Sequence, residues 1–174
     1  TRAAEAMIAA HESVLDHPGD VEQATDFVRS RIDGARNCLI DLQRLCTYGH
    51  FRLAEHMLQV RELLSGIGEA HSAFTTMLML RRAGVNARLV DLSGWRDEGD
   101  VTLDDRIRGA MSGIDPATEM PIVTGYAQCA EGLMREFDRG YSEVTFSKLA
   151  ALTGAREAII HKEFHLSSAD LRLV

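Results

Sequence analysis

The chain has 174 residues, of which 45% are hydrophobic and 26% are charged, as in ordinary soluble globular domains. This length is enough for one sizeable core, so a single domain is expected. The formal net charge of −7 at pH 7 argues against nucleic acid and anionic membranes as partners, because both usually recruit a basic face.

The chain contains neither a long apolar run nor a paired set of cysteines. No stretch approaches the roughly 18 consecutive apolar residues that indicate a membrane-spanning helix. Cys38, Cys46 and Cys129 are odd in number and form no Cys-x-x-Cys pair, which indicates reduced structural thiols. We therefore expect a cytoplasmic protein without a membrane partner.

In the first third of the chain, apolar residues recur at helical spacing. Residues 3–15 are predicted to form a helix, closed by a turn at 16–20. Between 21 and 64, apolar side chains recur every three or four positions, with a break expected at 48–50. A helical first third is therefore predicted.

After the Gly-x-Gly at 66–68, the period changes from helical to extended. A new helix is predicted at 69–83, ended by Gly84, and the apolar run at 87–91 is predicted to be a strand. The stretch 93–116 holds several glycines and acidic residues, which indicates a solvated excursion with one short helix.

The alternation of strand and helix continues toward the end of the chain. Residues 120–124 are predicted to be a strand, 142–153 a helix ended by Gly154, and 157–161 a further strand. Strands that alternate with helices pair in parallel, so an α/β layered fold is predicted. In such sheets ligands bind in the loops beyond the carboxyl ends of the strands.

The loop from 125 to 141 joins a predicted strand to a predicted helix and holds the first candidate site. Gly125 allows close approach of the backbone to a ligand, and Ser142 is a plausible N-cap at a helix terminus that suits an anion. Arg139 adds a planar fork for a carboxylate or phosphate. The same residues also fit an ordinary capped helix with a surface arginine, and the pattern alone leaves both open.

Glu69 follows the Gly-x-Gly directly and is expected in the first turn of a helix. A carboxylate there is favoured by the helix dipole whatever its function. The functional interpretation is that Glu69 faces the ammonium group of a ligand. A Gly-x-Gly without the rest of a dinucleotide fingerprint is a weak signal.

The run at 159–172 follows the last predicted strand and is rich in polar side chains. On an extended chain His161, Glu163 and His165 would share a face, so a metal site is conceivable. Lys162 and Arg172 offer phosphate contacts, which suit a nucleotide better than zinc.

Four stretches of the sequence are distinctive together: 48–50 (Tyr-Gly-His), 68–73 (Gly-Glu-Ala-His-Ser-Ala), 137–143 (Phe-Asp-Arg-Gly-Tyr-Ser-Glu) and 153–170. With them the chain resembles the amino-acid kinase family, most closely the aspartate kinases of the type associated with ectoine biosynthesis. The resemblance implies a three-layer αβα sandwich with a mainly parallel sheet.

The resemblance also implies roles for residues that match the family's motifs. A Gly-Glu at a helix start holds the substrate amino group in the family, and it falls on Glu69. The family's Gly-Arg-Gly-Gly-Ser-Asp falls on residues 138–143. Arg139 would thus bind the α-carboxylate of aspartate, with Ser142 and Glu143 near its polar groups and the transferring phosphate.

The family's nucleotide loop falls on residues 161–172, where this chain has the His-Lys-Glu-Phe-His variant of the ectoine-associated type. The implied nucleotide-binding residues are His161, Lys162, Ser167 and Arg172. The substrate loop departs from the family pattern at Tyr141, which replaces Gly, and at Glu143, which replaces Asp. That loop is therefore expected to be held differently.

By this resemblance, the expected activity is phosphorylation of the L-aspartate side-chain carboxylate by ATP with Mg²⁺, in an enzyme that commonly forms homo-oligomers. No acid or base residue is needed, because the attacking carboxylate is already ionised at pH 7.

The family's Lys-x-Gly-Gly phosphate loop does not occur in this chain. We expect residues 1–174 to be part of a single amino-acid kinase catalytic domain, incomplete at both ends and inactive alone. The alternative is a non-catalytic module with this fold that binds an amino acid or forms an oligomer. Another amino-acid kinase, acting on glutamate or a nucleotide, is disfavoured by the pairing of Glu69 with Arg139.

Overall fold

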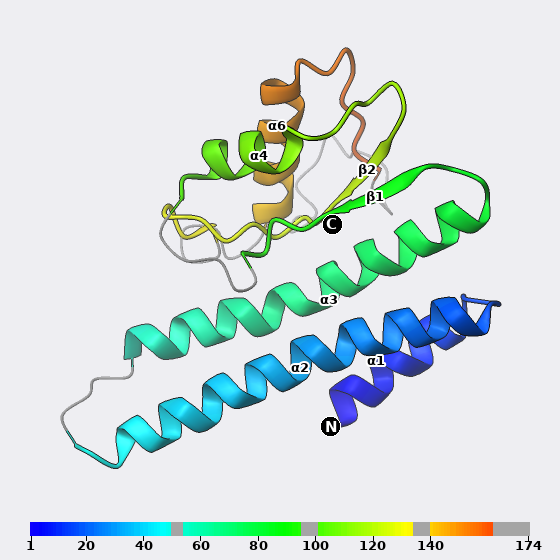
Figure 1. Cartoon of the computed structure of the whole chain (residues 1–174). Coiled ribbons are helices and arrows are strands. Elements are labelled where there is room, and N and C mark those ends of the chain that lie inside the picture. The colour runs from blue at the N-terminus through cyan, green and yellow to red at the C-terminus, as the bar shows by residue number, and fades with distance from the viewer. Residues whose placement is uncertain (50–53, 95–100, 134–139, 162–174) are drawn as a thin grey trace, which may run out of the picture.

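The computed structural model describes residues 1–49, 54–94, 101–133 and 140–161. These residues form a mixed fold of helices and a small parallel sheet, as the alternation of helical and extended spacing of apolar residues predicts. In chain order the elements are α1 (Arg2–Glu12), α2 (Pro18–Cys46), α3 (Ala54–Arg82), β1 (Ala87–Val90), α4 (Leu103–Met111), β2 (Met120–Val123) and α6 (Tyr141–Thr153). Figure 1 shows α2 and α3 as a long antiparallel hairpin beneath the strands, with α4 and α6 on the opposite side.

The helical first third is confirmed, including the break between α2 and α3. The turn predicted at 16–20 is shorter than expected, because α2 already begins at Pro18. The imidazole of His17 caps this helix by accepting a hydrogen bond of 3.1 Å from the Gly19 amide. Proline suits the first helical position, since its missing amide has no partner there anyway.

The prediction that a new helix begins at Glu69 is wrong, because α3 continues through Gly66 and Gly68 without a break. Gly66 has a packing reason to be glycine: a Cβ atom there would lie 2.5 Å from the Tyr126 ring. Ile67 is buried beside it. Packing against other parts of the chain thus stabilises a helix here, although the two glycines lower the helix propensity of the sequence. Gly68 is exposed and faces open space.

The two strands pair in parallel, in a register from Ala87 opposite Met120 to Val90 opposite Val123. Both strands and their parallel pairing are confirmed. The strand predicted at 157–161 is wrong: these residues are exposed, lack regular structure, and do not pair with β1 or β2. An apolar run forms a strand only where a neighbouring strand pairs with it through backbone hydrogen bonds.

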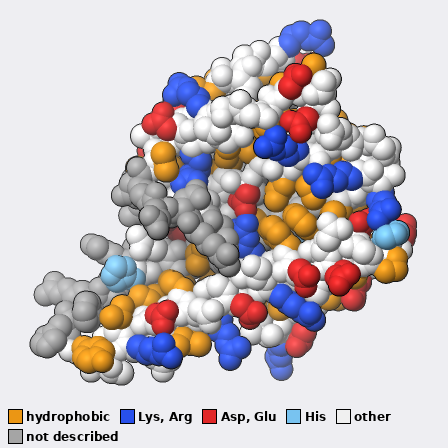
Figure 2. All heavy atoms as spheres, viewed as in Figure 1, with side chains coloured by type: hydrophobic (Ala, Val, Ile, Leu, Met, Phe, Trp, Pro, Cys, Tyr) orange, Lys and Arg blue, Asp and Glu red, His pale blue; other side chains and the backbone are white. Residues whose placement is uncertain are grey.

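Alternate residues of β1 pack into different apolar clusters. Ala87 lies with Leu78 of α3 in one cluster, whereas Val90 lies with Ile107 of α4 in the other. This follows from the period of two in a strand. Figure 2 shows basic and acidic side chains intermixed over one face, with hydrophobic side chains gathered between the strands and α3.

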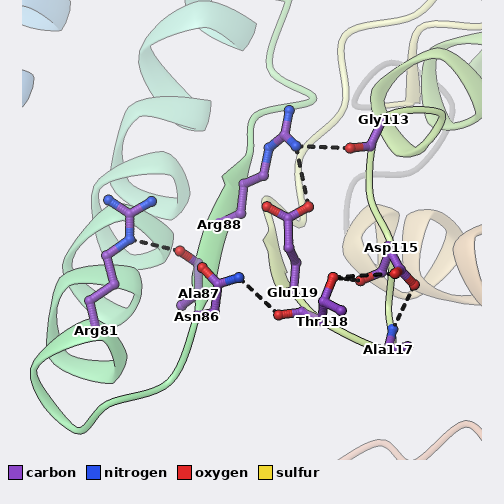
Figure 3. Close-up of polar contacts among 9 residues, drawn as sticks. All are labelled: Arg81, Asn86, Ala87, Arg88, Gly113, Asp115, Ala117, Thr118 and Glu119. Atoms are coloured by element: carbon purple, nitrogen blue, oxygen red, sulfur yellow. Dashed lines mark hydrogen bonds and ion pairs between the residues drawn. The ribbon is translucent and has the colours of Figure 1, made fainter.

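The amino ends of the two strands are tied together by polar contacts (Figure 3). The Arg88 guanidinium donates to the Gly113 carbonyl at 2.9 Å and to the Glu119 carboxylate at 3.4 Å. The Asn86 side-chain amide donates to the Thr118 carbonyl at 2.8 Å. These contacts hold the segment that enters β2 against the segment that enters β1.

None of the helices in the described ranges is long and apolar enough to cross a membrane. All three cysteines are free; Cys38 and Cys46 are exposed and Cys129 is buried.

Candidate functional site

Glu69 lies near the middle of α3 and contacts the first turn of α6. Its Oε1 atom accepts hydrogen bonds from the Tyr141 hydroxyl at 3.0 Å and from the Ser142 hydroxyl at 3.1 Å. These two donors are separated from Glu69 by more than seventy positions in the chain. The contact therefore exists only because the fold brings α3 and α6 together.

The other carboxylate oxygen of Glu69 is in a different situation. Oε2 is buried, and no residue in the described ranges forms a hydrogen bond with it. It faces Gly125, where an added Cβ atom would lie 2.8 Å from Oε2 and 2.9 Å from the Ser142 hydroxyl. Gly125 follows β2, so this oxygen lies at the carboxyl end of the parallel strands, where ligands bind in such sheets.

Thr124 forms hydrogen bonds that connect the carboxyl ends of both strands. Its buried hydroxyl accepts a hydrogen bond of 2.9 Å from the Leu92 amide and donates one of 3.0 Å to the Tyr126 carbonyl. Its own amide donates to the Val90 carbonyl at 3.1 Å. The position of Gly125 is therefore fixed from both strands.

Two tyrosine rings pack edge to face beside Glu69. The centroids of Tyr126 and Tyr141 are 6.1 Å apart, and their planes cross at 88°. Burial, then the nearby Glu69 carboxylate, raises the pKa of Tyr141 to about 12. Burial is also the main cause of the raised pKa of Tyr126, followed by the charge of Glu62. Both phenols are therefore neutral donors at pH 7.

The first turn of α6 differs from the predicted one. The N-cap is Gly140, with φ of 87°, and no side chain caps the helix. The prediction that Ser142 is the N-cap is wrong, because its hydroxyl donates to Glu69 instead. Glu143 is half-buried in the same turn, and its Oε2 would lie 3.7 Å from a Cβ on Gly140.

No protein-family profile matches the chain, and no solved structure matches it. A curated protein does match: the aspartate kinase Ask_Ect of Stutzerimonas stutzeri (strain A1501) is 53% identical over 168 residues, or 97% of this chain. The resemblance to aspartate kinases is thereby confirmed. The chain spans about a third of that kinase, 35% of its length.

The structure brings together some of the residues that the aspartate-kinase motifs single out. Glu69 and Ser142 are hydrogen-bonded, and Glu143 lies in the same turn as Ser142. His161 is exposed, beyond the end of α6. The other predicted site residues, Arg139, Lys162, Ser167 and Arg172, lie outside the described residues, as do Glu163 and His165 of the conceivable metal site.

Sequence reasoning missed Tyr141 as a partner of Glu69. The available signal was its departure from the aspartate-kinase pattern, which has a glycine at that position. A phenol is long enough to reach across from α6 to α3, and a glycine carries no side-chain donor. A departure within one motif thus marked a residue that contacts Glu69, the glutamate of another motif.

At the carboxyl end of β1, a buried arginine engages the polar side chains. Arg31 of α2 pairs with Asp91 and donates to the Ser93 hydroxyl at 3.1 Å. The guanidinium also lies 4.9 Å from the centre of the Phe27 ring, which stacks on Phe74. Asp91 is thus engaged in fixing the loop after β1, a role that the sequence did not reveal.

Within the described ranges, no group of three or more His, Cys, Asp or Glu side chains is placed to hold a metal ion. Magnesium needs no such cluster when it arrives on phosphates, because it keeps several waters and takes one or two carboxylates.

Proposed function

We propose that the protein carrying this chain is an aspartate kinase, which transfers the γ-phosphoryl group of ATP to the side-chain carboxylate of L-aspartate. The products are 4-phospho-L-aspartate and ADP, which would feed aspartate-family amino-acid or ectoine biosynthesis. The observation that carries the proposal is the 53% identity to an aspartate kinase along 97% of the chain.

The geometry around Glu69 supports a role as the clamp for the substrate ammonium. One carboxylate oxygen already accepts two hydroxyl donors, while the other has no partner among the described residues. A buried acceptor without a donor is unfavourable, and an ammonium group would satisfy both its charge and its hydrogen-bonding capacity. The neighbouring Gly125 allows the chain after β2 to approach this oxygen closely, because an added Cβ would lie 2.8 Å from Oε2.

The remaining substrate contacts are assigned by the motif match. Arg139 is the candidate for the α-carboxylate of aspartate, since its guanidinium can pair with a carboxylate through two hydrogen bonds. Glu143 and Ser142 lie in the first turn of α6, and Ser142 also helps to hold Glu69. For the nucleotide, the candidates are His161, Lys162, Ser167 and Arg172.

Chemically, this chain's residues bind and orient rather than exchange protons. The attacking carboxylate is ionised at pH 7, so no general base is required. Phosphoryl transfer depends on in-line positioning and on neutralisation of charge. Magnesium bound to ATP would supply part of that neutralisation. Glu69 and Arg139 would fix the two ends of the amino-acid backbone and so direct the side-chain carboxylate toward the nucleotide.

We further propose that the described sheet is part of a larger three-layer αβα sandwich, and that the protein is a cytoplasmic homo-oligomer. The parallel pairing of β1 with β2 and the two apolar clusters that contain strand residues support the layered fold.

The test is ATP-dependent formation of aspartyl hydroxamate by the full-length protein, with L-aspartate and L-glutamate compared. Glu69→Gln and Arg139→Ala should each lower activity on aspartate, whereas Glu119→Gln, at the opposite end of the strands, is the matched control. A folded full-length protein that binds L-aspartate but forms no hydroxamate would contradict the kinase proposal and favour the binding module.

A further inference from the structure

Tyr141 is placed to orient the carboxylate of Glu69. It is the first residue of α6, and its hydroxyl donates to Glu69 Oε1 at 3.0 Å. The ring is half-buried and packs edge-on against Tyr126. Tyr126 in turn packs on Gly66, one turn before Glu69 in α3. Both ends of the Tyr141 side chain are therefore held by α3 or by a residue that packs on it.

The two donors to Glu69 share one oxygen rather than taking one each. Tyr141 and Ser142 both donate to Oε1, at 3.0 and 3.1 Å. A planar carboxylate whose one oxygen is held by two donors cannot rotate without breaking a hydrogen bond. The second oxygen, Oε2, is consequently held toward Gly125, 2.8 Å from the point that a Cβ would occupy there.

The protonation state of Tyr141 suits this role. Burial and the Glu69 charge raise its pKa to about 12, so the phenol keeps its proton and remains a donor throughout the physiological range. A neutral donor stabilises the carboxylate without neutralising its charge. The negative charge of Glu69 thus remains available to a cationic group.

We propose that Tyr141 is a positioning residue that acts through Glu69, presenting Oε2 to the ammonium group of the substrate and so favouring α-amino acids over ligands without an amino group. This rests on the proposed function for the identity of the substrate.

The first experiment removes only the hydroxyl, with Tyr141→Phe in the full-length protein. Loss of one hydrogen bond that positions a charged group should weaken L-aspartate binding, measured by calorimetry and as KM, about 5- to 10-fold, with kcat changed less. Binding of succinate, which carries both carboxylates but no ammonium, should change less than about 2-fold. Tyr126→Phe removes a hydroxyl from the adjacent ring and is the matched control.

The second experiment asks whether the effect passes through Glu69. In the Glu69→Gln background, Tyr141→Phe should have little further effect on L-aspartate binding, since residues that act as a unit are not additive. Equal losses for aspartate and succinate, additive effects of the two changes, or an unchanged affinity in a folded Tyr141→Phe variant would each overturn the proposal.

Failure of the proposed function gives a different pattern. The wild-type protein would then bind L-aspartate without forming hydroxamate, while the binding comparison of the variants would still report on Tyr141. If the wild-type protein does not bind L-aspartate at all, both proposals are wrong. Thermal melting of each variant separates an effect on binding from an effect on folding.

Discussion

The two ends of the parallel strands differ in how far their polar side chains are satisfied. At the amino ends, side chains such as Arg88, Asn86 and Asp115 are engaged with carbonyls, amides or an opposite charge. At the carboxyl ends, the buried Oε2 of Glu69 has no partner within the described part of the chain and faces Gly125.

This difference separates polar groups that already have partners from a carboxylate oxygen that is open to a ligand. Polar groups at the amino ends are exposed or half-buried and contribute little beyond local order. A buried carboxylate oxygen without a donor destabilises the folded state, and a ligand that supplies the missing donor would remove this cost. Four experiments test these assignments.

The largest difference is expected between two glutamates, one at each end of the strands. Glu69→Gln should lower kcat/KM for L-aspartate roughly 10- to 100-fold, because a hydrogen bond to a charged group contributes about 1.5 to 3 kcal/mol. Its melting temperature should stay the same or rise, since the buried charge is removed. Glu119→Gln should leave activity unchanged and lose at most about 1 kcal/mol of stability with its ion pair to Arg88.

Equal activity losses in these two variants, measured by the hydroxamate assay on the full-length protein, would contradict the contrast. So would a large loss of stability in Glu69→Gln, which would make Glu69 a structural residue.

The second comparison uses two glycines. Gly125→Ala would put a Cβ 2.8 Å from Glu69 Oε2, so L-aspartate binding should weaken about 10-fold, with roughly 1 to 2 kcal/mol lost in the free energy of unfolding. At the amino ends, a Cβ on Gly113 would meet only the Arg88 guanidinium, at 4.0 Å. Gly113→Ala should change neither quantity, and calorimetry with urea unfolding measures both. If a folded Gly125→Ala variant binds L-aspartate as well as the wild-type protein does, the ligand does not lie against Gly125.

The third comparison lies within α3. Gly66→Ala should destabilise the protein by about 1 to 3 kcal/mol, because the new methyl group would lie 2.5 Å from the Tyr126 ring. Gly68→Ala, which faces open space, should stabilise the helix by about 0.5 to 1 kcal/mol. Urea unfolding of the two variants measures the difference. A Gly68→Ala variant that is stabilised but binds L-aspartate more weakly would place the ligand against the exposed face of α3 at Gly68 as well.

The smallest effect concerns buried imidazoles away from both strand ends. His11 of α1 and His71 of α3 form a hydrogen bond of 3.0 Å, and His11 also contacts Thr25 of α2. Burial is the main cause of the lowered pKa of both imidazoles; proximity to His11 lowers that of His71 further, while Glu12 raises that of His11.

The folded state therefore favours the neutral forms of both imidazoles. Their contribution to the free energy of unfolding is present above pH 6.5 and is lost as the pH falls. At pH 6 the loss should be about 1 kcal/mol or less for each imidazole, because proton uptake by the unfolded chain is still partial. Urea unfolding at pH 7.5 and 6.0 measures it, with His11→Gln expected to reduce the difference. A stability that does not change between these pH values would contradict the assignment.

Local sequence signals located most of the elements. Gly154, in the left-handed region with φ of 64°, ends α6 as predicted, and the apolar runs at 87–91 and 120–124 became the paired strands. The motif match also picked out Glu69 and Ser142, which the structure shows in contact. These signals work because helix ends and strand periodicity depend on residues close together in the chain.

Packing between segments that are far apart in the sequence decided the remaining features. No short stretch of sequence contains this information. Burial of Gly66 against Tyr126 keeps α3 continuous where its glycines predicted a boundary. Pairing with Glu69 draws the Ser142 hydroxyl away from the helix cap that its position predicted. The sequence motifs singled out Glu69 and Ser142 as candidates. Only the folded chain shows that Tyr141 and Ser142 both donate to one oxygen of Glu69 while the other faces Gly125, because these donors come from a helix more than seventy positions away in the sequence.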